Sequence, residues 1–403
     1  MASTPTNTAA AVPDTGPPVS SNLLIHLSTV SPDALEPALS NLSAALPGQP
    51  ILVAVPESVN SGTVDSFANL RVLPYTPAAP SPVNWVLTSD DYLNTYKLAL
   101  EHNVSACLLL GADAHTLTPE SIRNLAETTL SSPADLVVSH YHTGPREGLA
   151  NSAILYPLTR ALFCTKPRFP LAIDLGLSLR MAERLAATAQ RFTAANQNDA
   201  LLWPVSEAAL AGFTVSEANI PVRTAPQPAA ADLNALLNQI LGSFFADIDA
   251  KAAFWQRMRS VIPPRDVSAA PLPSEQLDVT AMLEAFHLAY SNLHEIWALV
   301  LPPQTLLGLK RLSVMPQDAF RIADSLWARI VYDFVLAYRL RTINRGHLLG
   351  ALTPLYLAWV ASHLILVQSG VPPERHIEDV AQAFETDKPY LVSRWRWPDR
   401  FNP

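Results

Sequence analysis

Short apolar runs alternate with helical patterns between Asn22 and about Pro221. This alternation is typical of an α/β domain in which helices connect the strands of a largely parallel sheet. Ser31 and Pro32 are residues that begin helices, and they follow the first apolar run. The expected strands are 23–27, 51–55, 71–74, 106–110 and 135–139.

From Ala231 onward the strand signals stop and long helical patterns replace them. The clearest helix is predicted from about Gln317 to Leu340, where apolar residues recur every four positions. Four prolines between Ile262 and Pro273 predict a linker or a turn between helical layers. We therefore expect an α/β domain over residues 21–230 and a helical domain over 231–403.

The segment Leu348–Val367 is apolar enough to raise the question of a membrane span, but it contains Thr353, Pro354 and His363. A buried helix without a membrane span is the better interpretation. Residues 1–20 are rich in Thr, Ala, Pro and Ser and predict a disordered tail without the features of an export signal. The two cysteines lie in apolar runs, which favours a cytoplasmic location.

The composition narrows the class of protein. Hydrophobic residues make up 49% of the 403 residues and charged residues 15%, so the chain should be globular. Its 35 acidic and 27 basic residues give a formal charge of −8, which argues against nucleic acid as a partner. No glycine-rich phosphate loop of the GxGxxG or GxxxxGK[ST] type occurs, so that mode of nucleotide binding is excluded.

Candidate ligand-binding residues follow two of the predicted strands. Asp113 and His115 come after the strand 106–110, at the end where open α/β sheets bind ligands. His140 and His142 close the next strand. If those strand ends are adjacent, three imidazoles and a carboxylate would suit a cation such as zinc. The alternative is a set of separate histidines in loops.

Three segments carry a family resemblance. EGLANSAILYPLTRALF (147–163) and RFPLAIDLGLS (168–178) are similar to the corresponding stretch of GT-A glycosyltransferases of the mannosylglycerate synthase and glucosyl-3-phosphoglycerate synthase type. LWARIVYDFVLAYRLRTINRGHLLGALTPLYLAWVASHL (326–364) resembles the helical C-terminal domain of bacterial relatives of those enzymes.

The resemblance implies a GT-A domain that binds a nucleotide sugar at the carboxyl ends of its strands, followed by a helical domain. It implies transfer of the sugar, with retention of configuration, to a small acceptor such as a glyceryl acid. It also implies a divalent metal, Mn or Mg, because the departing diphosphate must be neutralised.

The family's metal motifs are only partly present. The resemblance assigns Asp113 to the metal and to substrate binding, but the first carboxylate of the family's Asp-x-Asp loop is replaced by Gly111. The metal-binding His expected after the pair Ile220-Pro221 is also missing, and Pro226 stands in its place.

The donor and acceptor positions differ as well. Ala172 and Ile173 replace two glycines before Asp174, so Ile173 is expected to crowd the donor sugar. The resemblance implies catalytic roles for Asp174 on the sugar side and for Asp199 on the acceptor side, where Leu201 occupies the usual position.

Two arginines are candidate substrate contacts, Arg146 and Arg168. A solvated charge is the alternative interpretation of Arg146. Asp113 could instead cap the helix that begins near Pro119, and Asp174 could be a capping or solvated residue in a loop.

Three functions remain open from the sequence. The first is an active GT-A transferase that uses a nucleotide sugar, with Asp113, aided by His115 or His140, as a replacement metal site. The second is a catalytically inactive GT-A-fold binding or scaffold protein, favoured by the number of polar contacts that have been lost. The third is a metal hydrolase built on the histidines. Self-association, if it occurs, is expected through the helical domain.

Overall fold

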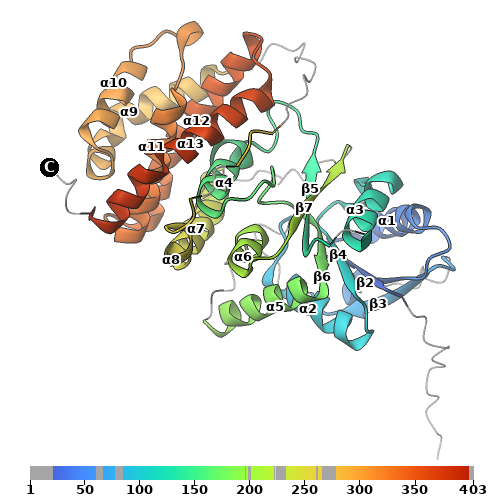
Figure 1. Ribbon diagram of the computed structural model, residues 1–403. Helices are drawn as coiled ribbons and strands as arrows, with labels where there is room; N and C mark the ends of the chain where they lie inside the picture. The colour runs from blue at the N-terminus through green and yellow to red at the C-terminus, as the bar shows by residue number, and fades with distance from the viewer. Residues whose placement is uncertain are drawn as a thin grey trace, which may run out of the picture.

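The computed structural model describes residues 21–59, 67–77, 85–131, 133–195, 197, 201–221, 223, 233–259, 262–265 and 278–398. It confirms an α/β domain with a mostly parallel sheet followed by an all-helical region (Figure 1). The predicted tail 1–20 and the candidate Asp199 lie outside the described residues, as does the proline-rich segment beyond residue 265.

The described residues form a seven-stranded sheet with the order β3-β2-β1-β4-β6-β5-β7. Strand β6 runs antiparallel to both of its neighbours, and the other pairs are parallel. The strands are β1 (Leu23–Leu27), β2 (Ile51–Pro56), β3 (Leu70–Tyr75), β4 (Ala106–Leu110), β5 (Leu136–Tyr141), β6 (Asp174–Ser178) and β7 (Val215–Ile220).

All five predicted strands are present, with ends displaced by at most two residues, but β6 and β7 were not predicted. Strand β6 is five residues long and contains Gly176, which weakens a strand signal. A Cβ atom at Gly176 would lie 1.9 Å from Oγ1 of Thr129, so the approach of the neighbouring helix requires glycine there. Tertiary packing therefore explains a residue that conceals the strand in the sequence.

Helices cover both faces of the sheet (Figure 1). Because side chains alternate along a strand, Leu23, Ile25 and Leu27 pack with α1 and α3, whereas Leu24 faces the core shared with α2 and α5. The helices of this domain are α1 (Pro32–Ala45), α2 (Ser89–Glu101), α3 (Pro119–Ser131), α4 (Tyr156–Phe163), α5 (Leu179–Ala194) and α6 (Pro204–Ala211). Short helical turns are η1 (Glu57–Val59), η3 (Ala114–Thr116) and the π-helical η4 (Asn151–Leu155).

The helical region consists of α7 (Leu233–Ala250), α8 (Ala252–Trp255), α9 (Thr280–Val300), α10 (Pro303–Leu312), α11 (Asp324–Leu340), α12 (Arg345–Gln368) and α13 (Pro373–Arg396). The predicted start at Gln317 is wrong. Gln317–Ala319 is the 3-10 turn η5, and residues 320–323 are not helical, so α11 begins only at Asp324.

Helix α12 contains the apolar segment 348–367. Its length and composition would allow it to cross a membrane, but most of it is buried inside the protein. It packs against α9 and α7, and Trp297 donates a hydrogen bond from its indole to the carbonyl of Ala351 (2.9 Å). The prediction of a buried helix is confirmed.

The two domains are joined through the segment that carries the family resemblance. Helix α4 precedes β6 in the chain, yet it packs on α13 and its apolar residues belong to the core of the helical region. The indole of Trp327 in α11 donates to the carbonyl of Ala153 in η4 (2.7 Å). Residues 151–163 are therefore part of the helical core, although they lie within the predicted α/β boundaries.

Candidate functional site

The carboxyl ends of β1 and β4 form the candidate ligand-binding edge of the sheet. Strands β2 and β3 lie on one side of β1 and β4 lies on the other, and open α/β sheets bind ligands where the strand order reverses in this way. Oγ of Ser28 and Nδ1 of His115 are buried at these ends without a hydrogen-bond partner in the described structure. Since buried polar atoms are normally paired, these two atoms are candidates for ligand contacts.

Asp113 lies in the loop after β4 with an exposed side chain and a left-handed backbone (φ 57°). It does not cap α3, because Thr118 Oγ1 accepts the N–H of Ser121 there (3.2 Å). The capping alternative for Asp113 is therefore wrong. Its carboxylate stays available to a ligand.

Asp174 is the first residue of β6 and is fully buried, so the interpretation of a solvated loop residue is wrong. Its partner is Arg223, two residues beyond the Ile220-Pro221 pair that ends β7. The two side chains form a bidentate ion pair, with Nε 2.9 Å from Oδ2 and Nη2 3.2 Å from Oδ1. Arg223 is itself only 3% exposed in its side chain, and this pair joins β6 to the end of β7.

Tyr141 holds the other side of the Asp174 carboxylate. Its hydroxyl donates to Oδ2 (3.0 Å) and accepts the backbone N–H of Asp174 (3.1 Å). Burial, and next the charge of Asp174, raises the pKa of Tyr141 well above its ordinary value. The tyrosine is therefore a neutral donor over the whole physiological range.

The four predicted metal ligands are not assembled. Within the described part of the chain, no group of three or more His, Cys, Asp or Glu side chains is placed to hold a metal ion. The prediction required the ends of β4 and β5 to be neighbours, but β6 lies between those two strands. Asp113 and His115 consequently belong to one loop, and His140 and His142 to another.

His140 instead faces the helical domain. Its Nδ1 lies 3.0 Å from Nη2 of Arg265. The side chain of His142, two residues later, is exposed. Burial first, and then the charge of Arg265, lowers the pKa of His140. A neutral His140 accepts the arginine proton, since guanidinium nitrogen atoms only donate.

The two candidate arginines have different surroundings. Arg146 is exposed in the loop after β5, and its charge contributes, after hydrogen bonds from Thr280, to lowering the pKa of Asp278 in the helical region. Arg168 is buried and forms an ion pair with Glu374 of α13 (2.9 Å). The structure thus gives Arg168 the role of joining the two domains.

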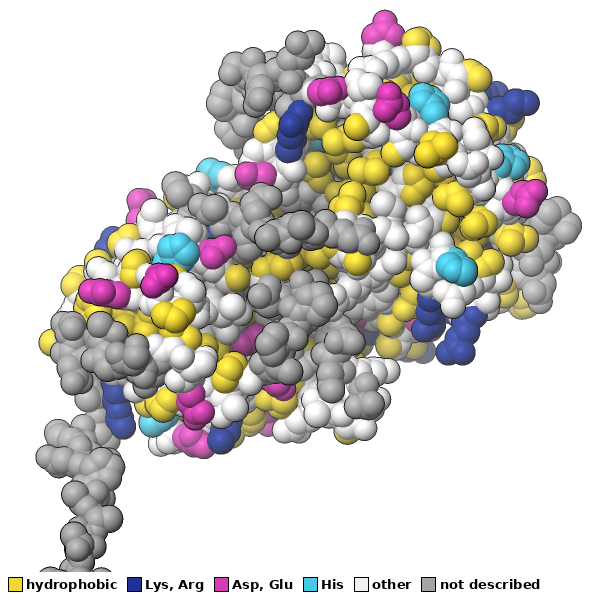
Figure 2. All heavy atoms as spheres, turned by 180° about the vertical axis from the view of Figure 1, so that it is seen from behind, with side chains coloured by type: hydrophobic (Ala, Val, Ile, Leu, Met, Phe, Trp, Pro, Cys, Tyr) yellow, Lys and Arg dark blue, Asp and Glu magenta, His cyan; other side chains and the backbone are white. Residues whose placement is uncertain are grey.

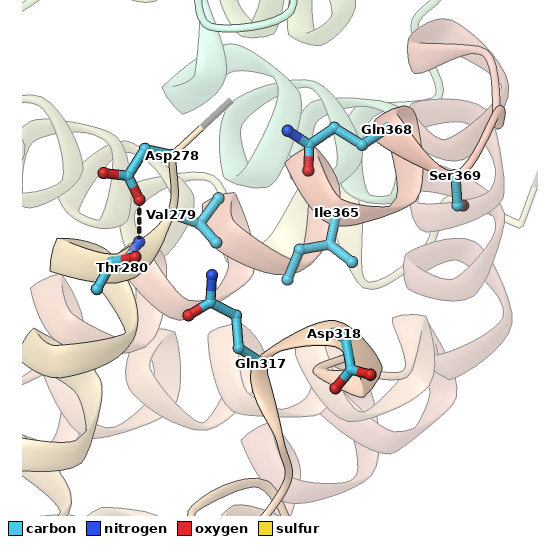
Figure 3. A pocket seen from close by; sticks show the side chains of 8 residues that line it. All are labelled: Asp278, Val279, Thr280, Gln317, Asp318, Ile365, Gln368 and Ser369. Atoms are coloured by element: carbon cyan, nitrogen blue, oxygen red, sulfur yellow. Dashed lines mark hydrogen bonds between the residues drawn. The ribbon is translucent and has the colours of Figure 1, made fainter. Parts of the chain in front are cut away.

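A pocket of about 840 Å³ opens in the helical region between the start of α9, η5 and the end of α12 (Figure 3). Its lining is mostly polar and includes two carboxylates: Asp278, Val279, Thr280, Gln317, Asp318, Ile365, Gln368 and Ser369. Its chemistry suits a polyhydroxyl or cationic group more than an anion.

Ser28, Arg223 and Tyr141 are residues of this edge that the sequence did not identify as functional. The signal for Arg223 was a cationic side chain two residues after Ile220-Pro221, three residues before Pro226, where the metal-binding His was sought. Tyr141 lies between His140 and His142, which were interpreted as metal ligands, and no sequence signal marked the tyrosine itself.

Comparisons with known proteins give structural neighbours only. No family model and no curated protein matches the chain. Glucosyl-3-phosphoglycerate synthase from Mycobacterium tuberculosis, in complex with Mg²⁺ and UDP, matches with a TM-score of 0.37 and 13% identity over 57% of this chain and 78% of that chain. A mannosyltransferase from Pyrobaculum calidifontis, in complex with GDP-Man and Mn²⁺, matches with a TM-score of 0.37 and 12% identity over 94% of this chain and 88% of that chain.

These neighbours are glycosyltransferases, at low TM-score and identity. The fold class, a mostly parallel α/β sheet followed by a helical domain, rests on the strands and helices of this chain itself.

Proposed function

We propose that this chain is a glycosyltransferase-like protein that binds a nucleotide sugar at the carboxyl ends of β1 and β4. The observation that carries the proposal is the pair of buried polar atoms without partners at this edge, Ser28 Oγ and His115 Nδ1. A nucleotide supplies donors and acceptors that would satisfy both atoms. Asp113, exposed beside them, is the proposed contact to the remaining polar groups of the ligand.

The acceptor side is proposed to face the helical region. The loop after β5 carries Arg146 toward that region, and an arginine there suits the carboxylate of a small acceptor such as a glyceryl acid. Asp199 remains the proposed carboxylate that would activate the acceptor hydroxyl. Transfer would form a bond from that hydroxyl oxygen to the sugar and release the nucleoside diphosphate.

The second candidate function is nucleotide-sugar binding without turnover. One observation favours it: Asp174, the expected sugar-side carboxylate, is fully buried and ion-paired with Arg223. In that case the chain would act as a binding or scaffold protein. An assay of sugar transfer to glyceryl acids, run on protein that has been shown to bind the donor, separates the two functions.

The binding claim is tested by calorimetry of the purified protein with UDP-glucose, GDP-mannose, UDP and GDP, with and without manganese. We expect a Kd tighter than about 0.1 mM, which corresponds to more than about 5 kcal/mol. Ser28→Ala should weaken binding at least about threefold, because it removes one hydrogen bond. Ser21→Ala, at the amino end of the same strand, is the matched control and should change nothing. Folded protein that binds no nucleotide would refute the proposal.

Self-association through the helical domain is a further part of the proposal. Figure 2 shows hydrophobic side chains gathered on one face of the helical region. Large apolar side chains are exposed on α9 and around α10, at Leu288, Leu299, Leu307 and Val314. Light scattering coupled to gel filtration should detect a dimer that Leu299→Glu converts to a monomer.

A further inference from the structure

Arg223 uses every hydrogen-bond donor that it has. Nε donates to Asp174 Oδ2 (2.9 Å), and Nη2 donates to Asp174 Oδ1 (3.2 Å) and to the carbonyl of Ala112 (2.6 Å). Nη1 donates to the carbonyl of Asp113 (2.5 Å) and to Oγ1 of Thr116 (2.9 Å). A guanidinium carries five N–H donors, so none is left over.

The Asp174 carboxylate is saturated in the same way. Oδ1 accepts from Gly111 N–H (3.2 Å) and Arg223 Nη2, and Oδ2 accepts from Tyr141 Oη (3.0 Å) and Arg223 Nε. A carboxylate offers about four lone-pair positions, and all four are used. A metal ion could bind Asp174 only after displacing a buried cation.

The same arginine fixes the shape of the loop after β4. Asp113 has a left-handed backbone, which is unfavourable for a residue with a side chain unless its surroundings hold it. Arg223 binds the carbonyls of Ala112 and Asp113 on either side of that turn. Ile173 closes the turn from the other side, because a Cβ atom on Gly111 would lie 2.8 Å from the Ile173 Cβ. Arg223 therefore holds the backbone conformation of the loop that carries Asp113.

We propose that Arg223 takes the place of a divalent cation at this edge of the sheet, so that the site binds its ligand without a metal. A divalent ion needs several oxygen ligands. Among the described residues the Asp174 carboxylate is saturated, and no group of three or more His, Cys, Asp or Glu side chains is placed to hold a metal ion. The guanidinium neutralises Asp174 and holds the loop, and Arg223 is thus a positioning residue. The identity of the ligand as a nucleotide sugar rests on the proposed function, but the absence of a metal requirement does not.

The first test uses Mn²⁺ alone, with electron paramagnetic resonance to count the bound ion. We expect the wild-type protein to show no site at this edge tighter than about 1 mM (about 4 kcal/mol). Arg223→Ala removes the cation that is paired with the Asp174 carboxylate. The variant should bind Mn²⁺ at this edge with an affinity at least tenfold higher than that of the wild type. That site should disappear in Arg223→Ala/Asp174→Asn. Arg180→Ala is the matched control for the loss of an arginine. It removes the partner of the buried Asp135, which directly precedes β5 at the opposite end of that strand from Tyr141.

Two results of this titration would overturn the inference. One is a Mn²⁺ site in wild type that is lost in Asp113→Ala or Asp174→Asn. The other is a folded Arg223→Ala protein, judged by circular dichroism, that gains no Mn²⁺ site. Where Arg223→Ala does not fold, Arg223→Gln replaces it, because the amide keeps two donors but removes the charge. The wild-type titration needs no variant at all.

The second test measures nucleotide binding in EDTA and in Mn²⁺. If the wild-type protein binds UDP and GDP in EDTA within about twofold of its affinity in Mn²⁺, the result would support a site without metal. Loss of binding in EDTA would overturn the inference. Arg223→Ala should bind at least tenfold more weakly in EDTA and recover in Mn²⁺, a recovery that a merely structural role would not give. If no nucleotide binds, the proposed function fails, while the Mn²⁺ titrations still decide the role of Arg223.

Discussion

Arg160 of α4 is the residue on which the packing of the segment 151–163 against α13 should depend most. It is 1% exposed and is bonded to α13 through Glu378 (Nη1 to Oε2, 2.5 Å) and Glu385 (Nε to Oε1, 3.0 Å). It also donates to the hydroxyl of Tyr156 (3.0 Å) and to the carbonyl of Ile262 (2.9 Å). One guanidinium thus joins α4, α13 and the start of the proline-rich segment.

Arg160→Met should lower the free energy of unfolding by about 3 kcal/mol. Removing one partner of a buried ion pair costs about 3–5 kcal/mol, because the other charge stays buried without compensation. The lower end applies here, since Glu378 keeps the Tyr156 hydroxyl (2.5 Å) and the N–H of Arg265 (3.1 Å). Arg160→Met/Glu378→Gln removes both charges and should cost at least about 2 kcal/mol less than the sum of the single variants.

The measurement is urea unfolding followed by circular dichroism and tryptophan fluorescence. Arg375→Ala is the control. It removes an exposed ion pair with Asp379 on the same helix, and it should cost less than about 0.5 kcal/mol. A cost below about 1 kcal/mol for Arg160→Met, or single costs that add within about 0.5 kcal/mol in the double variant, would refute the assignment of this cluster as the ion-pair network that holds α4 on α13.

Three further predictions concern the core. Phe334→Ala removes a fully buried ring from α11 and should cost about 3–5 kcal/mol in denaturant melts; less than about 1 kcal/mol would contradict the helix face. Burial, and then the charge of His376, lowers the pKa of His363 to about 3, below the ordinary value of about 6.5. Wild type should therefore lose about 1.4 kcal/mol per pH unit as the pH falls below about 6.5, and His363→Phe should lessen that slope; equal slopes would show that His363 does not contribute. Gly176→Ala should destabilise the fold, because its methyl group would lie 1.9 Å from Thr129 Oγ1; an unchanged melting temperature would argue against this close approach.

Much of the fold followed from local pattern. Five strands, the change to helices after about residue 230 and the buried apolar helix over 348–367 all appear as periodicity in the sequence, because each element buries one face or both. The start of α11 was placed too early, since Ile322 is buried like a helical core residue although it lies outside any helix. Burial alone does not distinguish these two conformations.

Only the tertiary structure decided the arrangement of the candidate site. The sequence determined that Asp113 and His115 follow a strand. It did not determine that β6 runs antiparallel between β4 and β5, which separates the two pairs of histidines, nor that Arg223 reaches Asp174 from 49 residues away in the chain. The physical reason is that strand order and ion pairing depend on long-range packing, whereas periodicity and capping signals depend only on residues that are near each other in the chain.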